Sequence, residues 1–304
     1  MIDLKSMVLP EMEEYFRSLN LPRFRSKQVF SWLHEKRAAS FDEMTNLPLS
    51  LRQQLAEQCA LTTLVIERKL VSQLDGTIKY LYRLPDGNHI ESVLMRYEHG
   101  NSLCISSQVG CKMGCAFCAS TKAGFVRNLT PSEILEQVYM AGRDTGEKVS
   151  NIVMMGIGEP LDNYDNVLRF LELVSDPNGL NLSHRHISLS TCGVVDKIYD
   201  LADRSEIMPI NRRWGIKELL DACRYYTDKT HRRISYEYAL IAGVNDSRKQ
   251  AEELAALLKG MLCHINLIPV NYVREAATVR RTLGADINAA CGQLRREAEE
   301  PGRE

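Results

Sequence analysis

The sequence lacks the features that mark exported and membrane-spanning proteins. Its N-terminal segment has no basic stretch followed by an apolar run, so no secretory signal peptide is expected. No apolar stretch approaches the ~20 residues that span a bilayer. The nine cysteines are therefore predicted to be ligands or reactive thiols in a reducing cytosol, and not disulfides. We expect a cytoplasmic protein without a membrane partner.

The sequence also lacks an excess of charge and any low-complexity segment. It has 38 Lys and Arg residues against 39 Asp and Glu residues, so a surface that binds nucleic acid would have to be local. The hydrophobic and charged fractions, 44% and 25%, are those of an ordinary globular protein. A chain of 304 residues can form one large α/β domain and a smaller one.

The most informative stretch is a short loop with three cysteines. Cys111, Cys115 and Cys118 have the spacing C-x3-C-x2-C, which can direct three thiolates at one object but supplies no fourth ligand. A structural zinc site uses four protein ligands. An iron–sulfur cluster held by three cysteines would instead keep one iron open for a small molecule. Gly110 and Gly114 permit close backbone approach and favour the cluster over three cysteines packed in a buried turn.

Residues 1 to about 90 are predicted to form a separate α+β unit. Ser26 is expected to be the N-cap of the second of three helices, and the helices are predicted over residues 10–19, 26–36 and 48–60. Asp75-Gly76 and Asp86-Gly87 then predict two hairpin turns between short strands.

A basic segment lies within this unit, over residues 21–37. Its cations are interrupted by a single acid, Glu35, and by the aromatic residues Phe24 and Trp32. One interpretation is a solvated helix face over buried aromatic side chains. The other is a local surface that contacts the RNA backbone.

From about residue 100 the sequence alternates between strands and helices, which is typical of parallel β/α units. Short runs rich in Ile, Val or Leu predict buried strands over residues 102–107, 151–155, 186–191, 234–240 and 264–269. Helices are predicted over residues 163–174, 197–202, 215–226 and 246–258. Thr130, Pro131 and Glu133 form a capping box that starts a further helix after the cysteine loop.

This alternation is interrupted at two junctions. Residues 203–211 connect two predicted helices without a strand, and residues 271–278 pass directly from one strand-like segment into another. A barrel without an interior strand would expose backbone groups and core side chains. We therefore expect missing segments near residues 203–207 and 271–277. The alternative is a genuine deletion, which would put the fold and the activity in doubt.

Several motifs together resemble a known family. The cysteine loop and the turn Gly156-Ile-Gly-Glu-Pro160 resemble the radical S-adenosylmethionine (SAM) superfamily. Five further stretches resemble its RlmN/Cfr family of adenine methyltransferases: Cys104-Ile-Ser-Ser-Gln-Val-Gly-Cys111, Leu189-Ser-Thr-Cys-Gly193, Met208-Pro-Ile-Asn211, Gly243-Val-Asn-Asp246 and Ala289-Ala-Cys-Gly-Gln-Leu294. Ala119-Ser-Thr121 and the Gly-Glu-Pro turn are similar to the branch that methylates carbon 2 of adenine. This chain departs from the family at the same two junctions, where the family has a strand and a loop with a helix.

The resemblance implies a fold, an organisation and a set of site residues. The fold is α/β, a partial (β/α)6 TIM-like radical SAM barrel over residues 91–304, with an N-terminal accessory domain, residues 1–90, that contacts RNA. The implied ligands of a [4Fe-4S] cluster are Cys111, Cys115 and Cys118. The implied SAM contacts are Gly158, Glu159, Ser190 and Asn271. The implied catalytic residues are Cys291, Cys104 and Glu91.

The resemblance also implies the chemistry and the partners. One SAM methylates Cys291, and a second is cleaved at the cluster to a radical that activates this methyl group. Cys104 would release the methylated adenine by forming a disulfide with Cys291, and Glu91 would accept a proton. The substrates would be 23S rRNA and tRNA, the electron donor a flavodoxin-type protein, and the enzyme a monomer.

Each assignment has a plainer alternative. Cys291 and Cys104 could be packing residues, Glu91 an exposed strand glutamate, and the SAM-contact positions loop caps. Cys59, Cys192, Cys223 and Cys263 match no functional position and are predicted to pack. Three other functions remain open: methylation of carbon 8 of adenine, RNA binding by a non-catalytic iron–sulfur protein, and a zinc-binding structural protein.

Overall fold

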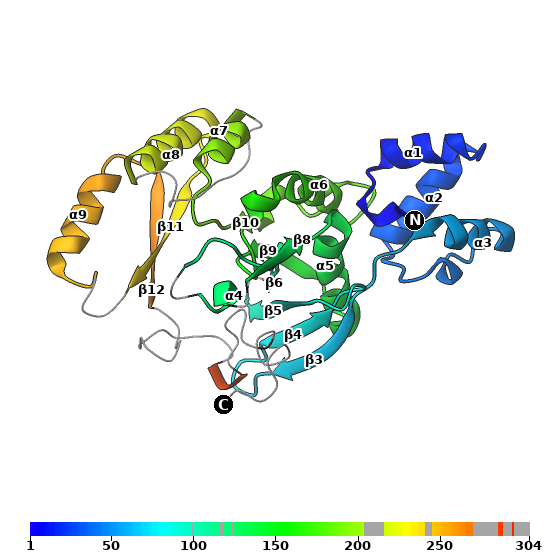
Figure 1. Cartoon of the computed structure of the whole chain (residues 1–304), viewed down its shortest axis with the longest axis horizontal. Helices are drawn as coiled ribbons and strands as arrows, with labels where there is room; N and C mark the ends of the chain where they lie inside the picture. The colour runs from blue at the N-terminus through cyan, green and yellow to red at the C-terminus, as the bar shows by residue number, and fades with distance from the viewer. Residues whose placement is uncertain are drawn as a thin grey trace.

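The computed structural model describes residues 1–98, 100–115, 118–122, 124–203, 216–240, 245–269, 285–287 and 294. These residues form three parts, which follow one another along the chain in Figure 1. Short helices make up the N-terminal part, a six-stranded sheet lies at the centre, and a two-stranded parallel sheet with its helices follows.

The N-terminal part contains three helices and a pair of short parallel strands. Its elements are β1 (Ile2–Asp3), η1 (Leu4–Ser6), α1 (Leu9–Ser18), α2 (Arg23–His34), η2 (Phe41–Glu43), α3 (Leu49–Gln58) and β2 (Cys59–Ala60). The prediction that Ser26 caps α2 is wrong. The helix begins directly after Pro22, and the Ser26 hydroxyl is buried inside it, where it donates to the Arg23 carbonyl at 2.6 Å.

Buried polar contacts attach this part to α5 (Pro131–Thr145). The Lys5 ammonium donates to Glu136 Oε2 at 2.9 Å, and neither side chain is exposed to solvent. His34 Nδ1 lies 2.9 Å from the Tyr139 hydroxyl, and burial lowers the pKa of His34 to about 3, so its ring is neutral. These contacts fix the N-terminal helices against the sheet-covering helix.

The central sheet has the strand order β10-β9-β6-β5-β4-β3. Its strands are β3 (Val65–Val71), β4 (Ile78–Arg83), β5 (His89–Tyr97), β6 (Gly100–Cys104), β9 (Val149–Met154) and β10 (Ile187–Leu189). Neighbours from β3 to β6 are antiparallel, whereas β6, β9 and β10 are parallel. Both predicted hairpin turns are present, with Gly76 and Gly87 at φ of 70° and 86°, values that a residue with a side chain rarely adopts.

The two faces of this sheet have different surroundings. On one face Leu103 and Ile152 belong to the main hydrophobic core, together with Leu135 of α5 and Phe170 of α6 (Tyr164–Ser175). Side chains alternate between the faces of a strand. The residues next to Leu103 and Ile152 in their strands therefore point to the opposite face. Cys104 is one of them, and it lies opposite Val93 of β5 and Val153 of β9.

The helix after the cysteine loop begins as the sequence predicts. The Thr130 amide donates to Glu133 Oε2 at 2.9 Å, and the Glu133 amide donates to the Thr130 hydroxyl at 3.3 Å. The helix ends at Thr145, and the next residue, Gly146, has a φ of 69°, the left-handed conformation that commonly terminates helices. The predicted capping box is confirmed.

The third part continues the β/α alternation. Its elements are α7 (Val195–Asp203), α8 (Ile216–Thr230), β11 (Ile234–Leu240), α9 (Arg248–Leu258) and β12 (Cys263–Pro269). Within the described ranges β10 pairs only with β9, and β11 pairs only with β12. The two junctions where segments are expected to be missing, near residues 203–207 and 271–277, lie outside the part of the chain that the structure describes, apart from Asp203 at the end of α7.

The remaining elements are short. They are β7 (Gln108–Gly110), α4 (Ala119–Lys122), β8 (Phe125–Asn128), η3 (Pro160–Asn163), η4 (His184–His186) and η5 (Ala285–Ile287). No described helix has the length and the apolar character needed to cross a membrane. Residue 90, the expected domain boundary, falls inside β5, and the division into two domains stays a prediction.

Candidate functional site

Three loops follow three adjacent parallel strands, and each carries predicted site residues. The cysteine loop comes after β6, the Gly156–Pro160 turn after β9, and Ser190 to Cys192 after β10. The carboxyl ends of neighbouring parallel strands meet at one edge of a sheet, where α/β proteins bind their ligands. The structure therefore brings together motifs that lie far apart in the sequence.

The cysteine loop lies between the paired strands β7 and β8. Gly110 and Gly114 have φ of 77° and 72°, so the tight backbone depends on glycine at both positions. The Cys118 amide donates to the Cys115 carbonyl at 3.0 Å, which folds the second half of the loop into a turn. Cys111 is buried, whereas Cys115 and Cys118 are half-buried.

The cysteine arrangement fits a cluster with several iron atoms. Burial, with Cys118, Glu159 and Cys115 nearby, raises the pKa of the Cys111 thiol to about 11, and metal binding would release its proton. In the described residues no three His, Cys, Asp or Glu side chains converge closely enough to bind a single metal ion. A cluster does not require such convergence, because each thiolate binds a different iron atom.

The turn after β9 packs directly against the strand that enters the cysteine loop. The Glu159 amide donates to Gln108 Oε1 at 2.9 Å, and Gln108 Nε2 donates to Asp162 Oδ2 at 2.8 Å. Gly158 has φ of 104°, and a Cβ there would lie 2.5 Å from the Gln108 Cβ. Only glycine fits this position, so the turn and the cysteine loop hold one another in place.

Glu159 connects this turn with the loop after β10. Its carboxylate is almost completely buried, with 2% of the residue exposed, and it accepts from the Leu161 amide at 3.0 Å and the Cys192 amide at 2.8 Å. Burial raises the pKa of Glu159, and these backbone donors oppose the shift. The Cys192 thiol is hydrogen-bonded to Cys115, and this contact, together with the Glu159 carboxylate, raises the pKa of Cys192. Cys192, predicted to be a packing residue, thus lies beside a predicted cluster ligand.

We expect Gly158→Ala to weaken SAM binding. An alanine in this backbone conformation carries a strain of about 1–3 kcal/mol, and its Cβ would displace Gln108 and the turn beside Glu159. The dissociation constant for SAM should rise roughly tenfold or more, measured by equilibrium binding to the cluster-loaded enzyme. Gly87→Ala is the control, since Gly87 also has positive φ but has no atom within 4 Å of the added Cβ. Equal affinities of the two variants would contradict the assignment of Gly158.

Glu91 and Cys104 lie on the same face of the central sheet. Glu91 is opposite Leu81 of β4, and Val93, two residues further along β5, is opposite both Lys79 and Cys104. Residues directly opposite one another share a face. Cys104 is 7% exposed and Glu91 is fully buried, so the interpretation of Glu91 as an exposed strand glutamate is wrong.

Glu91 forms a buried ion pair that the sequence did not predict. Lys79 Nζ lies 3.2 Å from Glu91 Oε2, and neither side chain is exposed to solvent. The Glu91 carbonyl also accepts from the Ser106 hydroxyl at 2.6 Å, which ties β5 to the chain that leaves β6. A lysine between Ile78 and the aromatic and apolar residues 80–82 was the signal that could have indicated a buried partner.

We expect Lys79→Met to destabilise the protein strongly. Removing one member of a buried ion pair typically costs about 3–5 kcal/mol, because the other charge stays buried without it. Lys69→Met is the control, since Lys69 of β3 and Asp144 of α5 form a partly exposed pair, for which about 0–1 kcal/mol is expected. Anaerobic urea unfolding of the cluster-loaded enzyme measures both. A loss for Lys79→Met no larger than that for Lys69→Met would contradict the buried pair.

The other predicted site residues have different outcomes. Ser190 follows β10 directly and is half-buried, next to the Glu159 contact with Cys192. Asn271 and Cys291 lie outside the described residues. All cysteines in the described part are free thiols. The roles of these residues stay predictions.

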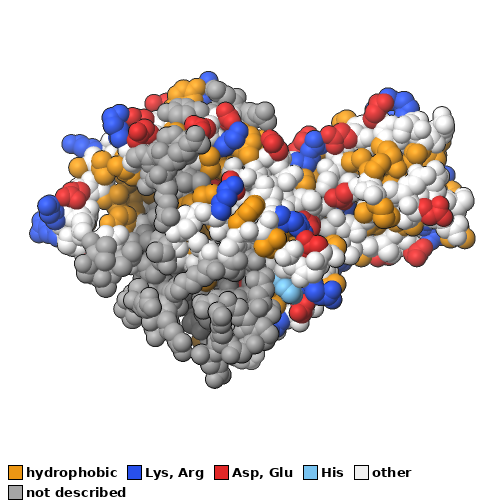
Figure 2. Space-filling view, in the orientation of Figure 1, with side chains coloured by type: hydrophobic (Ala, Val, Ile, Leu, Met, Phe, Trp, Pro, Cys, Tyr) orange, Lys and Arg blue, Asp and Glu red, His pale blue; other side chains and the backbone are white. Residues whose placement is uncertain are grey.

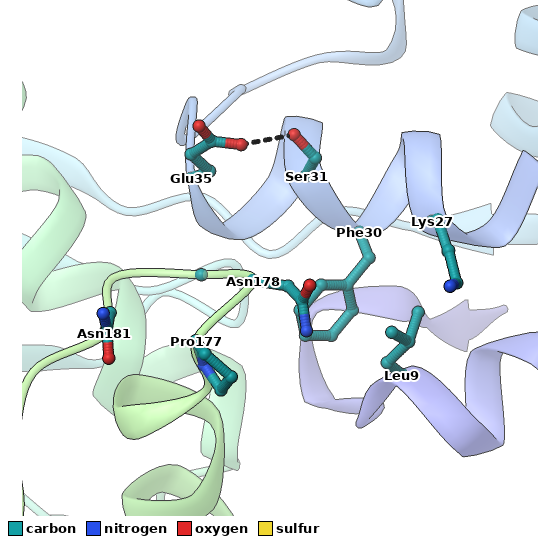
Figure 3. Close-up of a pocket in the computed structure, with 9 residues that line it drawn as sticks. Leu9, Lys27, Phe30, Ser31, Glu35, Pro177, Asn178 and Asn181 are labelled. Atoms are coloured by element: carbon teal, nitrogen blue, oxygen red, sulfur yellow. Dashed lines mark hydrogen bonds between the residues drawn. The ribbon is translucent and has the colours of Figure 1, made fainter. Parts of the chain in front are cut away.

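A separate pocket lies between the N-terminal helices and the loop after α6. It has a volume of about 410 Å³, and Figure 3 shows Lys27 and Phe30 of α2 on one side of it and Pro177 and Asn178 on the other. Glu35 accepts from the Ser31 hydroxyl at 2.6 Å at one end. No predicted site residue is among its described lining residues, so this pocket is distinct from the cysteine loop.

Comparison with known proteins gives separate family matches for the N-terminal part and for the region of the cysteine loop. Residues 2–61 match the model of the ribosomal RNA large subunit methyltransferase N-terminal domain, and residues 105–208 match that of the radical SAM superfamily. A solved radical SAM methyltransferase from Sphaerobacter thermophilus is 41% identical, with a TM-score of 0.88 over 96% of this chain and 99% of that one. This likeness confirms the predicted α/β fold with a partial barrel.

Two curated relatives are similar over nearly their whole length. A probable dual-specificity RNA methyltransferase RlmN from Alkaliphilus oremlandii is 51% identical over 337 residues, covering 97% of this chain and 98% of the relative. The corresponding protein from Lachnospira eligens is 49% identical, covering 97% and 96%. The first aligned span, 337 residues, exceeds the 304 residues of this chain by 33, so that relative has residues where this chain has none.

Proposed function

Because this chain belongs to the RlmN family of radical SAM RNA methyltransferases, we propose that it methylates carbon 2 of adenine in 23S rRNA and tRNA. The observation that carries this proposal is the meeting of the cysteine loop, the Gly158–Glu159 turn and the Ser190 loop at the ends of three adjacent strands. Carbon 2 of adenine has no acidic proton, so ordinary methyl transfer from SAM would lack a nucleophile. A radical route removes that obstacle.

Residues of the three loops, together with Asn271, would hold the cofactors. Cys111, Cys115 and Cys118 would bind the [4Fe-4S] cluster, while Gly158, Glu159, Ser190 and Asn271 would contact SAM. When bound, the cluster and SAM supply the radical that removes a hydrogen atom from an unreactive methyl group. The buried Glu159 carboxylate, fixed by two backbone donors, would set the shape of the SAM-binding turn.

The methyl group would pass through a cysteine of this chain. The thiolate of Cys291 would displace the methyl group of one SAM and carry it as a thioether. After this carbon has bonded to adenine, Glu91 would take the proton from carbon 2. Cys104 would then attack the sulfur of Cys291, so that the sulfur–carbon bond breaks, a disulfide forms and the released carbon takes up a proton. Burial of Glu91 and Cys104 on one sheet face supports this division of roles.

RNA would be held in part by the N-terminal unit, residues 1–90. Phe24 is 54% exposed with the Arg25 guanidinium 4.8 Å from its ring centre, and the Lys36 ammonium lies 3.8 Å over Trp32. In such pairs the aromatic ring can stack on a base and the cation can bind a phosphate. In Figure 2 acidic side chains stand among the basic ones on this lobe, and Arg23 is paired with Glu13 at 2.7 Å. Because the cations are interspersed with acids, this surface would make only local contacts with RNA. The target adenine would be flipped out of its stack to meet the methyl group carried by Cys291.

Several further assignments belong to the same proposal. A flavodoxin-type protein would reduce the cluster, and the enzyme would act as a cytoplasmic monomer. The junctions near residues 203–207 and 271–277 would account for residues that the relatives have and this chain lacks, which the longer aligned span supports. An intact mass of 34.5 kDa, that of this sequence, would instead indicate that both junctions are genuine.

Product mapping tests the proposed function. Reduced, cluster-loaded enzyme is incubated anaerobically with SAM and either a 23S rRNA fragment or tRNA, and the nucleosides are analysed by tandem mass spectrometry. We expect 2-methyladenosine together with release of 5′-deoxyadenosine. Formation of 8-methyladenosine would assign the chain to the carbon-8 reaction. Binding of SAM and RNA without 5′-deoxyadenosine release would instead indicate a non-catalytic iron–sulfur protein.

A further inference from the structure

One aspartate near the C-terminus is bonded to a hairpin turn more than 200 residues away. The Asp286 carboxylate accepts from the Ser72 hydroxyl at 2.6 Å through Oδ1 and from the Gln73 amide at 2.9 Å through Oδ2. Asp286 lies in η5, and Ser72 and Gln73 open the turn between β3 and β4. Figure 1 shows η5, in red, beside the end of these strands. Both carboxylate oxygens are therefore used in one long-range contact.

The turn is a firm anchor for this carboxylate. Ser72 is 3% exposed, and its hydroxyl accepts from the Leu74 and Asp75 amides at 3.2 and 3.3 Å while donating to Asp286. The Ser72 amide donates to the Thr77 carbonyl at 2.8 Å, which closes the turn. The hydrogen bond from Ser72 lowers the pKa of Asp286, so the carboxylate is ionised and accepts these bonds at neutral pH.

The anchored turn leads directly into the sheet face that carries predicted catalytic residues. Lys79, two residues after the turn closes, pairs with Glu91, and the neighbouring strand β6 carries Cys104. In the sequence Cys291 comes five residues after Asp286 and three before Leu294. Leu294 is 3% exposed, so one described residue before Cys291 and one after it contact the rest of the protein. At ~3.6 Å per residue, the five residues from Asp286 to Cys291 span at most roughly 18 Å.

We propose that Asp286 is a positioning residue that docks the segment bearing Cys291 onto the β3–β4 turn. This inference rests on the proposed function, because it concerns the cysteine that would carry the methyl group. The same sulfur must reach SAM, the adenine and Cys104 in turn, and a cysteine on a loose segment would meet them rarely. Fixing the segment at Asp286 raises the effective concentration of the thiol at these partners.

Four variants of the cluster-loaded full-length enzyme test the proposal. Asp286→Ala removes both hydrogen bonds of the contact, whereas Ser72→Ala removes the one from the hydroxyl and leaves the one from the Gln73 amide. The other two variants are the double variant and Asp75→Ala, which is the control. Asp75 lies in the same turn and accepts from the Thr77 amide at 2.9 Å, so its replacement alters the turn without removing the Asp286 carboxylate. For Asp286→Ala we expect kcat for adenine methylation to fall roughly 10- to 100-fold, with KM for SAM unchanged. The double variant should be no worse than the more impaired single variant.

Hydrogen–deuterium exchange provides a readout that does not depend on activity. The Gln73 amide should be protected in the unmodified protein and exchange freely in Asp286→Ala, while protection in the central sheet is retained. Loss of this protection without a fall in kcat would overturn the proposal, as would an equal fall in Asp75→Ala. Exchange at Gln73 that is already free in the unmodified protein would overturn it as well. If the unmodified enzyme made no 2-methyladenosine, the proposed function would fail while the exchange data still reported the contact.

Discussion

Replacing Cys291 with alanine is expected to abolish adenine methylation while the iron–sulfur cluster is retained. The cluster would be held by the loop at Cys111, Cys115 and Cys118, which is closed by its own β7–β8 pair and needs no contribution from Cys291. Methyl transfer, in contrast, would lose its only nucleophile. Removal of a covalent nucleophile lowers kcat by roughly 10⁴- to 10⁶-fold in enzymes where it has been tested.

Two matched variants separate methyl transfer from cluster assembly. Cys118→Ala should lose both the cluster and the activity, since two thiolates remain in the loop. Cys263→Ala should keep both, because Cys263 lies at the start of β12 and away from the three loops. The measurements are the visible absorption of the cluster, iron content and anaerobic transfer of labelled methyl groups to RNA. Normal product formation by Cys291→Ala would exclude a methylated-cysteine mechanism.

The second large effect concerns Cys104. Its replacement by alanine is expected to leave RNA covalently attached to the protein, because the sulfur–carbon bond to Cys291 would have no thiol to break it. Product should then stay below one per enzyme molecule. Denaturing gels, with and without nuclease, measure the adduct. Cys104 lies at the carboxyl end of β6, the strand that precedes the cysteine loop, and on the sheet face of Glu91.

Cys223→Ala is the control for Cys104→Ala. Cys223 is also buried, but it packs with Val195 and Ile198 in a separate hydrophobic cluster. This variant should turn over repeatedly and form no adduct. Multiple turnovers by Cys104→Ala, or the absence of any adduct, would remove Cys104 from the product-release step and leave it as a packing residue.

Short-range features of the fold were predictable from the sequence. The capping box at Thr130 and the two Asp-Gly turns are confirmed, because their hydrogen bonds join residues only a few positions apart. The error at Ser26 has the same local origin. A serine hydroxyl can bond either forward to an amide at a helix start or back to a carbonyl inside the helix. Here the N-cap is Pro22, four residues before the predicted N-cap Ser26.

The candidate site was predictable only in its motifs. The spacing of Cys111, Cys115 and Cys118 indicated a three-ligand cluster, and the turn at Gly158 indicated a close approach of backbone, which the 2.5 Å separation from Gln108 explains. Cys192 was assigned to packing because no feature of the neighbouring sequence indicates a contact with Cys115, which lies 77 positions earlier. The parallel pairing of β6 with β9 and of β9 with β10 brings the two together.

By itself the sequence determined the family, the cysteine spacing that suits a cluster, and most helix and strand positions, since each depends on side-chain chemistry or on periodicity over a few residues. Only the tertiary structure decided that Glu91 is buried against Lys79, that Glu159 joins two loops, and that Asp286 is bonded to the β3–β4 turn. The reason is physical. These contacts depend on strand order and register, which position residues far apart in the chain on one face, and no local pattern specifies which distant residue will be the partner.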